Sequence, residues 1–427
     1  MKQFQTIYKR NKGLSIWLEQ IRLFCDSHHI SDSSVLFHIF TNTLAREPLE
    51  IVLSMLHGVF PEALYAGVTS TGNIIHGSLV ETKISLTCSV FEDPDTTVMV
   101  LQMPMTYETQ AGSAEKLLGI VNDNPWVKGI EMLTTLGQVD MPAFCNQISA
   151  MPQEIQVYGG GAHALEVVNG DTSDTFVFSS SGDPSTYTAV FILMGGPDFH
   201  ISTSHLTGWR VLGKPLMVTS ASRNLLHELD GRPALEVYRH YLNVPTDDRF
   251  YRLCNEFPLL FEENKTEYLR VIASHLPDGS LRLGATVDEA RSCCITYGDP
   301  VHIMHTVHEM VRKIHPFGPQ AIRFFSCAGR KFFWGPKEVS RETLPFEMLA
   351  PSAGFFTAGE IHRTGGKIYM HNITLVIAAM REGEAAASLP ELTLQERNDF
   401  SHQLLVSSCL ATFIQMQQQE IAENKGS

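Results

Sequence analysis

A nine-residue pattern that occurs twice constrains the fold of this chain more than any other feature. Residues 66–74 read AGVTSTGNI and residues 353–361 read AGFFTAGEI, so both fit A-G-x-x-[ST]-x-G-x-I. Strand-like apolar runs flank each copy, at 34–40 and 83–90 for the first and at 321–327 and 374–379 for the second. Glycine suits a sharp turn or a close approach of the backbone. The pattern predicts two related halves, with the function located where they meet.

The composition is that of an acidic globular protein. A chain of 427 residues, 44% hydrophobic and 18% charged, is long enough for two or three domains of roughly 150 residues each. The net charge of −14 argues against nucleic acid and against an anionic membrane surface as partners. The sequence contains no apolar run near the roughly 20 residues that cross a bilayer, and no secretory signal. The eight cysteines contain no C-x-x-C pair, which predicts reduced thiols in a cytoplasmic protein.

The order of helical and strand-like segments predicts an α/β fold with mixed β-sheets covered by helices. Helical spacing at 14–28 and 48–59 alternates with strand-like runs at 35–40 and 63–68. This β-α-β order is typical of a parallel or mixed sheet. Similar alternation continues through the chain, and includes a strand expected at 269–273.

We expect a first domain at 1–210, a second at 211–388 and a C-terminal segment at 389–427. Within that segment, residues 395–423 read as one long helix that leads to an output domain. Its apolar seam contains Leu410, Ile414 and Ile421. Such a weak coiled-coil seam fits a homodimer, and the alternative is a helix folded back on the second domain.

Three side chains that follow buried strands could carry chemistry. Arg330 can clamp a ligand carboxylate with two hydrogen bonds, or it can pair with Glu360 for structure. Cys327 is either a thiol activated by that positive charge or an ordinary buried thiol. Glu360 occupies the turn of the second copy of the pattern, where the first copy has Asn73. These two polar side chains therefore face a shared space or cap neighbouring backbone.

Two further patterns give weaker signals. The Gly-rich segment 159–161 fits neither the dinucleotide fingerprint nor the P-loop, which favours a tight turn over a nucleotide site. His302, His305 and His308 recur at steps of three on a predicted helix. Three-residue steps rotate by roughly 60° around an α-helix, so these histidines converge poorly on a metal. A solvated or half-buried helix face is the favoured interpretation.

Several motifs in combination resemble the FIST sensory domains. FSCAGR at 325–330, PSAGFFTAGEI at 351–361 and HNIT at 371–374 resemble the C-terminal FIST domain. GWRVLGKP at 208–215 and ELDGRPAL at 228–235 are similar to the N-terminal FIST domain. The resemblance covers most of residues 30–385.

This resemblance implies a bacterial sensory module that binds a small ligand such as an amino acid. The signal would pass to a diguanylate cyclase, a histidine kinase or a chemoreceptor. Some relatives look like haem proteins that sense nitric oxide, but the resemblance identifies no haem-ligating histidine here. Asn73 stands where relatives often have Glu, and Asp288-Glu289-Ala290 replaces a more usual Glu-Gly turn. The ligand therefore need not be that of better-known members.

Residue chemistry and the resemblance together predict recognition of a carboxylate-bearing metabolite, without turnover and without a resident metal or cofactor. Arg330 would hold the anion, and Glu360 would bind a cationic group or orient Arg330. The other expected contacts are hydrogen bonds from Asn372, Thr357 and Thr219 and apolar walls from Trp209 and Phe355. The alternatives are a haem-binding nitric oxide sensor and an enzyme with Cys327 as nucleophile, which requires a nearby base.

Overall fold

The chain forms two compact units in the computed structural model. The structure describes residues 1–164, 174–247, 249–263, 265–287, 291–386, 389, 391–394, 410, 413, 414 and 416. Unit 1 contains the described residues of 1–206, 306–370 and 374–394. Unit 2 contains those of 207–305 and 371–373, together with the described residues after 394. The predicted boundaries at 210 and 388 remain predictions.

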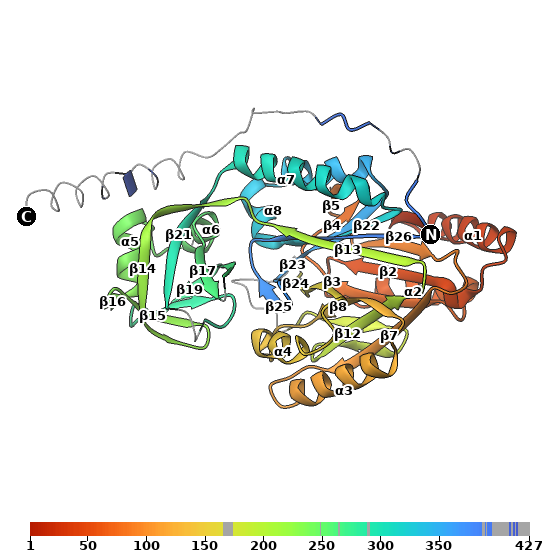
Figure 1. Cartoon of the computed structure of the whole chain (residues 1–427), viewed down its shortest axis with the longest axis horizontal. Coiled ribbons are helices and arrows are strands. Elements are labelled where there is room, and N and C mark those ends of the chain that lie inside the picture. The colour runs from red at the N-terminus through yellow and green to blue at the C-terminus, as the bar shows by residue number, and fades with distance from the viewer. Residues whose placement is uncertain are drawn as a thin grey trace, which may run out of the picture. The chain divides into compact units, whose positions relative to one another are not determined.

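Unit 1 is built from three repeats of one pattern of strands and helices (Figure 1). Each repeat runs through a first strand, a helix, a central strand, a second helix, a strand parallel to the central one, a β-hairpin and a last strand. Repeat I consists of β1 (Lys2–Tyr8), α1 (Asn11–Ser27), β2 (Val35–Thr41), α2 (Glu47–Val59), β3 (Leu64–Thr69), the hairpin β4 (Asn73–Ile75) and β5 (Ser78–Val80), and β6 (Ile84–Val90).

Repeats II and III follow the same order. Repeat II consists of β7 (Thr97–Pro104), α3 (Gln110–Asp123), β8 (Val127–Thr134), α4 (Met141–Ile148), β9 (Gln156–Gly161), β10 (Val177–Ser179), β11 (Gly182–Ser185) and β12 (Thr188–Gly195). Repeat III consists of β13 (Phe199–Leu206), α7 (Pro300–Ile314), β22 (Ala321–Cys327), α8 (Ala328–Trp334), β23 (Ser352–Thr357), β24 (Glu360–Thr364), β25 (Lys367–His371) and β26 (Leu375–Glu382). Most of unit 2 is inserted in the chain between β13 and α7, and the first residues of α7 also belong to it.

Each repeat forms a six-stranded sheet that is completed by the hairpin of another repeat. The three strand orders are β1-β6-β2-β3-β10-β11, β7-β12-β8-β9-β24-β25 and β13-β26-β22-β23-β4-β5. Repeat II thus lends its hairpin to the sheet of repeat I, repeat III to that of repeat II, and repeat I to that of repeat III. In each of these three sheets the central strand and its follower pair in parallel, namely β2–β3, β8–β9 and β22–β23.

Three glycines at equivalent positions make these parallel pairs possible. Gly67, Gly159 and Gly354 lie opposite Ile39, Met132 and Phe324. A Cβ atom at these glycines would lie 2.5, 2.0 and 2.0 Å from the carbonyl oxygens of those partners. The repeated sequence pattern therefore marks two of three equivalent repeats. The prediction of a tight turn at the Gly-rich segment 159–161 is wrong, because this segment is the end of β9, the parallel strand of repeat II.

Alternation along each strand separates an outer face from an inner one. In repeat I, Val35, Phe37 and Ile39 pack with apolar side chains of α1 and α2. Leu36 and Phe40 point the other way and join a buried core with residues of all three repeats. Helices therefore cover the outer face of this sheet, as predicted for an α/β fold.

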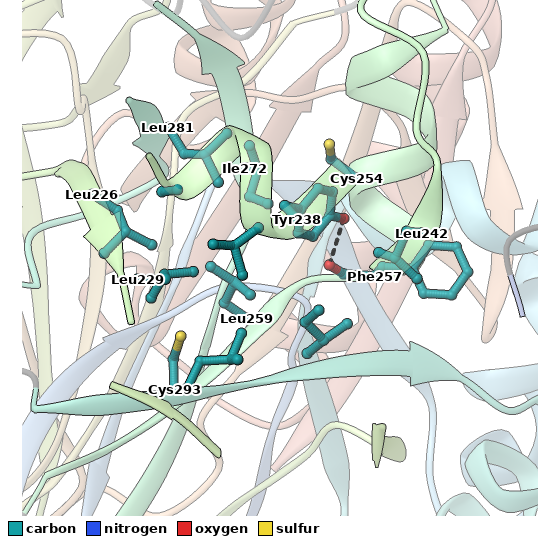
Figure 2. Close-up of a cluster of buried hydrophobic side chains, with 14 of the residues drawn as sticks. Leu226, Leu229, Tyr238, Leu242, Cys254, Phe257, Leu259, Ile272, Leu281 and Cys293 are labelled. Carbon is teal, nitrogen blue, oxygen red and sulfur yellow. Dashed lines mark hydrogen bonds between the residues drawn. The ribbon is translucent and has the colours of Figure 1, made fainter. Parts of the chain in front are cut away.

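Unit 2 contains antiparallel strands with two short helices (Figure 1). Its elements are β14 (Trp209–Ser222), β15 (Leu225–Leu229), β16 (Arg232–Pro233), α5 (Ala234–Leu242), α6 (Phe250–Glu256), β17 (Leu259–Glu263), β18 (Thr266–Arg270), β19 (Ile272–His275), β20 (Leu281–Leu283) and β21 (Ser292–Gly298). Figure 2 shows its core, where Tyr238 donates a hydrogen bond of 2.8 Å to the carbonyl of Phe257. The strand expected at 269–273 is divided between β18 and β19.

The predicted helix at 395–423 lies mostly outside the described residues. Phe413 is buried in the core of unit 2, with its ring centroid 5.7 Å from that of Tyr241. Leu410 is partly buried against the same core, whereas Ile414 is 56% exposed. Ile421 lies outside the described residues, so the homodimer through this helix remains a prediction. Among the described residues, no helix is both long enough and apolar enough to cross a membrane.

Candidate functional site

The carboxyl ends of the three parallel pairs are joined to one another by backbone hydrogen bonds. His163 N–H donates to the carbonyl of Thr69, which links β9 to β3. Phe356 N–H donates to Gly72 O at 2.8 Å, which links β23 to the turn after β3. Gly161 N–H donates to Gly359 O at 2.8 Å and closes the ring. Since ligands of open parallel sheets bind beyond the carboxyl ends of strands, this ring of turns is the candidate site.

Glu360 is the main titratable side chain at these strand ends. It is fully buried, and it accepts hydrogen bonds from the hydroxyl of Thr357 and from the backbone N–H of Thr374. The thiol of Cys327 contacts the same carboxyl group. Burial raises the pKa of Glu360 to about 8, although these hydrogen bonds and the charge of Arg330 oppose the rise. Glu360 is therefore an uncharged acid at neutral pH.

The same arrangement occurs at the end of β3 with a neutral side chain. Ser70 Oγ donates to Asn73 Oδ1 at 2.5 Å, and Asn73 Nδ2 donates to the carbonyl of Phe40 at 3.1 Å. Ser70 and Asn73 lie 287 residues before Thr357 and Glu360. The pair Ser70–Asn73 connects its turn to the end of β2 through Phe40. The pair Thr357–Glu360 connects its turn to the end of β22 through Cys327. The amide of Asn73 is neutral at any pH, whereas the carboxyl group of Glu360 is neutral only while it carries its titratable proton.

Arg330 is buried against Glu342, which lies at the end of a 3-10 helix at Val339–Glu342. Its Nε and Nη2 atoms donate to the two carboxylate oxygens at 2.8 and 2.6 Å. The indole N–H of Trp334 donates to Glu342 Oε1 at 2.5 Å. A ligand carboxylate would therefore have to compete with Glu342 for this guanidinium.

Sequence reasoning missed two cationic or titratable groups beside the same turns. Lys331 Nζ donates to the carbonyl of Thr71 at 2.6 Å and lies 2.9 Å from Glu81, whose side chain is 52% exposed. His163 is buried, and its Nδ1 accepts from the backbone N–H of Ala164. Burial and the charge of Lys331 lower the pKa of His163. Neither Lys331 nor His163 belongs to a recognisable sequence motif, because their contacts join repeats that are far apart in the chain.

The predicted site residues are divided between the two units. Cys327, Thr357 and Glu360 lie together in unit 1, and Phe355 lies deeper on β23, with its ring 4.9 Å from that of Phe40. Trp209, Thr219 and Asn372 belong to unit 2. In unit 2 the indole N–H of Trp209 donates to the carbonyl of Glu256, and the hydroxyl of exposed Thr219 accepts from the N–H of Gly231. The side chain of Asn372 is buried beside Gly284.

Family models match most of the chain. The FIST N domain matches residues 36–232, and the FIST C domain matches residues 234–363. The chain belongs to the FIST family. A search of curated proteins gave no match.

FIST domains are sensory domains, so the protein contains a signal-sensing module. Both FIST matches include residues of unit 1 and of unit 2, so the two FIST domains do not coincide with the compact units. The strand ends at Cys327, Thr357 and Glu360 lie within the FIST C match. Those at Ser70 and Asn73 lie within the FIST N match.

The FIST module shows no metal centre in the part of the chain that the structure describes. His302, His305 and His308 all lie on α7, as predicted. No group of three or more His, Cys, Asp or Glu side chains among the described residues is placed to hold a metal ion. The buried imidazole of His362 already contacts Thr364 through Nδ1 and Thr203 through Nε2.

Proposed function

We propose that the chain is a sensory input module that binds a small, amino-acid-like metabolite at the strand ends of unit 1. The signal then passes to an output such as a diguanylate cyclase or a histidine kinase. The observation that carries this proposal is the uncharged, buried acid Glu360 within a ring of turns that joins all three repeats. The family supports sensing, and the residues around Glu360 support the ligand class.

Two groups at the strand ends complement the two charges of an amino acid. Among the described residues, the ion-pair partner of the Lys331 ammonium is the half-exposed carboxylate of Glu81, so this ammonium remains attractive to a ligand carboxylate. Glu360 complements an ammonium group once it has lost its proton. Arg330 adds positive charge nearby. Asn372, Thr219 and Trp209 belong to unit 2, and the contacts expected from them remain predictions outside this proposal.

Binding of a cationic group beside Glu360 should release a proton. A nearby positive charge lowers the pKa of a carboxyl group, and Glu360 begins from a pKa of about 8. The affinity should therefore rise with pH up to about 8, by as much as tenfold per pH unit if one proton is released. A ligand that binds without contact to Glu360 would show no such dependence.

Thermal-shift screening of the full chain with the common amino acids identifies the ligand, and calorimetry in two buffers of different ionisation enthalpy counts the protons. We expect release of about one proton at pH 7 from the wild type and none from Glu360→Gln. Asp247→Asn is the matched control, because it removes an exposed carboxylate of unit 2 and should leave binding unchanged.

Two outcomes would overturn the proposal. One is that no amino acid stabilises the wild type. The other is that Glu360→Gln binds with unchanged affinity and proton release. An absorption spectrum after haem addition tests the alternative, since a stoichiometric Soret band that shifts with nitric oxide would make the protein a gas sensor.

A further inference from the structure

A second buried charged cluster lies in unit 1, well inside the strands. His38 Nε2 lies 3.0 Å from Glu131 Oε1, and Arg323 Nη2 lies 3.1 Å from His38 Nδ1. Arg323 Nε is 3.9 Å from Glu131 Oε2. None of the three side chains is more than 1% exposed. We call His38, Glu131 and Arg323 the charged triad.

Each repeat contributes one member of the triad, and the three positions are equivalent. His38 lies on β2, Glu131 on β8 and Arg323 on β22, which are the central strands of repeats I, II and III. Each lies one position before the residue that faces the repeat's close-packed glycine. The triad is therefore a direct polar contact among all three repeats.

The hydrogen-bond roles assign the charges. Arg323 can only donate, so His38 Nδ1 accepts and His38 Nε2–H faces Glu131. Burial and the charge of Arg323 lower the pKa of His38. Burial alone would raise the pKa of Glu131, but His38, Arg323 and the hydroxyl of Tyr158 together outweigh it and lower that pKa. The triad thus holds one cation, one anion and a neutral imidazole, and has no net charge.

Hydroxyl groups accompany the triad in repeat I alone. The last strand of that repeat, β6, turns Ser85, Thr87 and Ser89 to the inner face, since its alternate residues pack against the helices. The equivalent positions are Val190, Ile192 and Met194 in β12, and Val376, Ala378 and Met380 in β26. Thr87 is the lateral neighbour of His38.

These hydroxyls can stabilise a proton on His38. Ser89 Oγ lies 3.4 Å from Arg323 Nη2. The hydroxyls of Ser85 and Thr87 are buried and have no hydrogen-bond partner among the described residues. They are available to reorient toward a new positive charge or toward a guanidinium that has moved. The other two repeats offer only apolar groups at the same positions.

We propose that the charged triad is a proton-sensitive contact that holds the three repeats in register and so positions the strand ends. Protonation of His38 places two cations against one carboxylate, and Nδ1 can no longer accept from Arg323. The contact between repeats I and III is then lost. Cys327 lies four residues beyond Arg323 on the same face of β22, so the strand-end site shifts with it. The contact exists whether or not that site binds an amino acid.

Native-state hydrogen exchange tests the proposal, because β2, β8 and β22 report on unit 1 by themselves. His38→Gln keeps one donor for Glu131 and one acceptor for Arg323 but does not titrate. When the pH is lowered from 7.5 to 5.5, the opening equilibrium constant of these strands should rise in the wild type. The rise should be roughly tenfold smaller in His38→Gln. His57→Gln, on the exposed side of α2, is the matched control and should behave as the wild type.

A double-mutant cycle separates a shared contact from three independent buried groups. Arg323→Met leaves Glu131 buried without its cation, and Arg323→Met with Glu131→Gln removes both charges. Adding the free-energy effects of the two single variants predicts an opening equilibrium constant for the double variant. We expect the measured constant to be at least tenfold smaller than that prediction. Additive single effects, or a His38→Gln variant with the full acid response of the wild type, would overturn the proposal.

Discussion

The turns at Ser70–Asn73 and Thr357–Glu360 are equivalent in two repeats, yet they differ in one functional group. Both have a hydroxyl that donates to a buried side chain three residues later. Asn73 carries an amide that donates onward to a backbone carbonyl. Glu360 carries a carboxyl group whose pKa is raised to about 8 by burial.

We propose that this difference marks the ligand site of the repeated scaffold. An amide completes the turn at no electrostatic cost, whereas a carboxyl group in the same place is stable only while it is protonated. The fold does not require an acid at position 360, because position 73 shows that an amide suffices. The acid is therefore best explained by what it can bind.

The largest expected effect comes from removal of Arg330, whose guanidinium lies near the second turn. Arg330→Met leaves the carboxylate of Glu342 buried without its ion-pair partner. We expect a loss of about 3–5 kcal/mol in the free energy of unfolding, measured by urea denaturation. Arg330→Met with Glu342→Gln should recover part of it. An effect below about 1 kcal/mol for the single variant would contradict a tightly paired, desolvated contact.

Asn73→Asp places an acid in the first turn and tests whether that turn tolerates one. The new carboxylate would face the carbonyl of Phe40, to which Asn73 now donates. We expect a loss of about 3 kcal/mol at pH 7.5 and a smaller loss at pH 4.5, where a protonated acid can donate. Thermal melts at the two pH values check this, and a loss that does not change with pH would show that the acid escapes to solvent.

Glu360→Gln converts the second turn to the chemistry of the first. The wild type binds a proton at position 360 when folded up to about pH 8, but when unfolded only up to the ordinary pKa of 4.5. Its stability should therefore fall as pH rises from 4.5 to 8, and then level off. Gln removes this fall, so we expect a gain of about 4 kcal/mol at pH 7.5 and almost none at pH 4.5. Parallel pH profiles for the two proteins would refute the raised pKa.

The smallest effects come from the two hydroxyl groups. Ser70→Ala and Thr357→Val each remove one donor, and each should cost about 1 kcal/mol in unfolding free energy. Only Thr357→Val should also raise the pKa of Glu360 further, since Thr357 favours its ionised form. Carbon-13 NMR of the Glu360 carboxyl group measures this, with Ser70→Ala as the matched control.

Helices, strands and part of the candidate site could be predicted from the sequence alone. Periodicity predicted the helices that became α1 and α2, because their apolar stripes match the 3.6-residue period. The repeated pattern located both turns and pointed to Glu360. Cys327, Thr357 and Glu360 meet in the structure because Cys327 and Thr357 end the paired strands β22 and β23, and Glu360 begins the next strand.

Contacts between distant segments could not be predicted in the same way. Repeat II has Gly159 in place, but the turn after β9 lacks the rest of the pattern, so the sequence there shows only a Gly-rich segment. Arg330 pairs with Glu342 rather than Glu360, and nothing in the spacing distinguishes the two carboxylates. The triad was also missed, since His38, Glu131 and Arg323 are single charges in otherwise apolar strands.

The exchange of hairpins has a consequence for how unit 1 assembles. Asn73 of β4 pairs with Phe355 of β23, a contact between residues 282 positions apart in the chain. Such high contact order predicts slow folding, and until β23 is available the hairpin of repeat I has no sheet to join. The unfilled edge can accept the same hairpin from a second copy. Refolding at high protein concentration should therefore yield domain-swapped oligomers, which dilution during refolding would suppress.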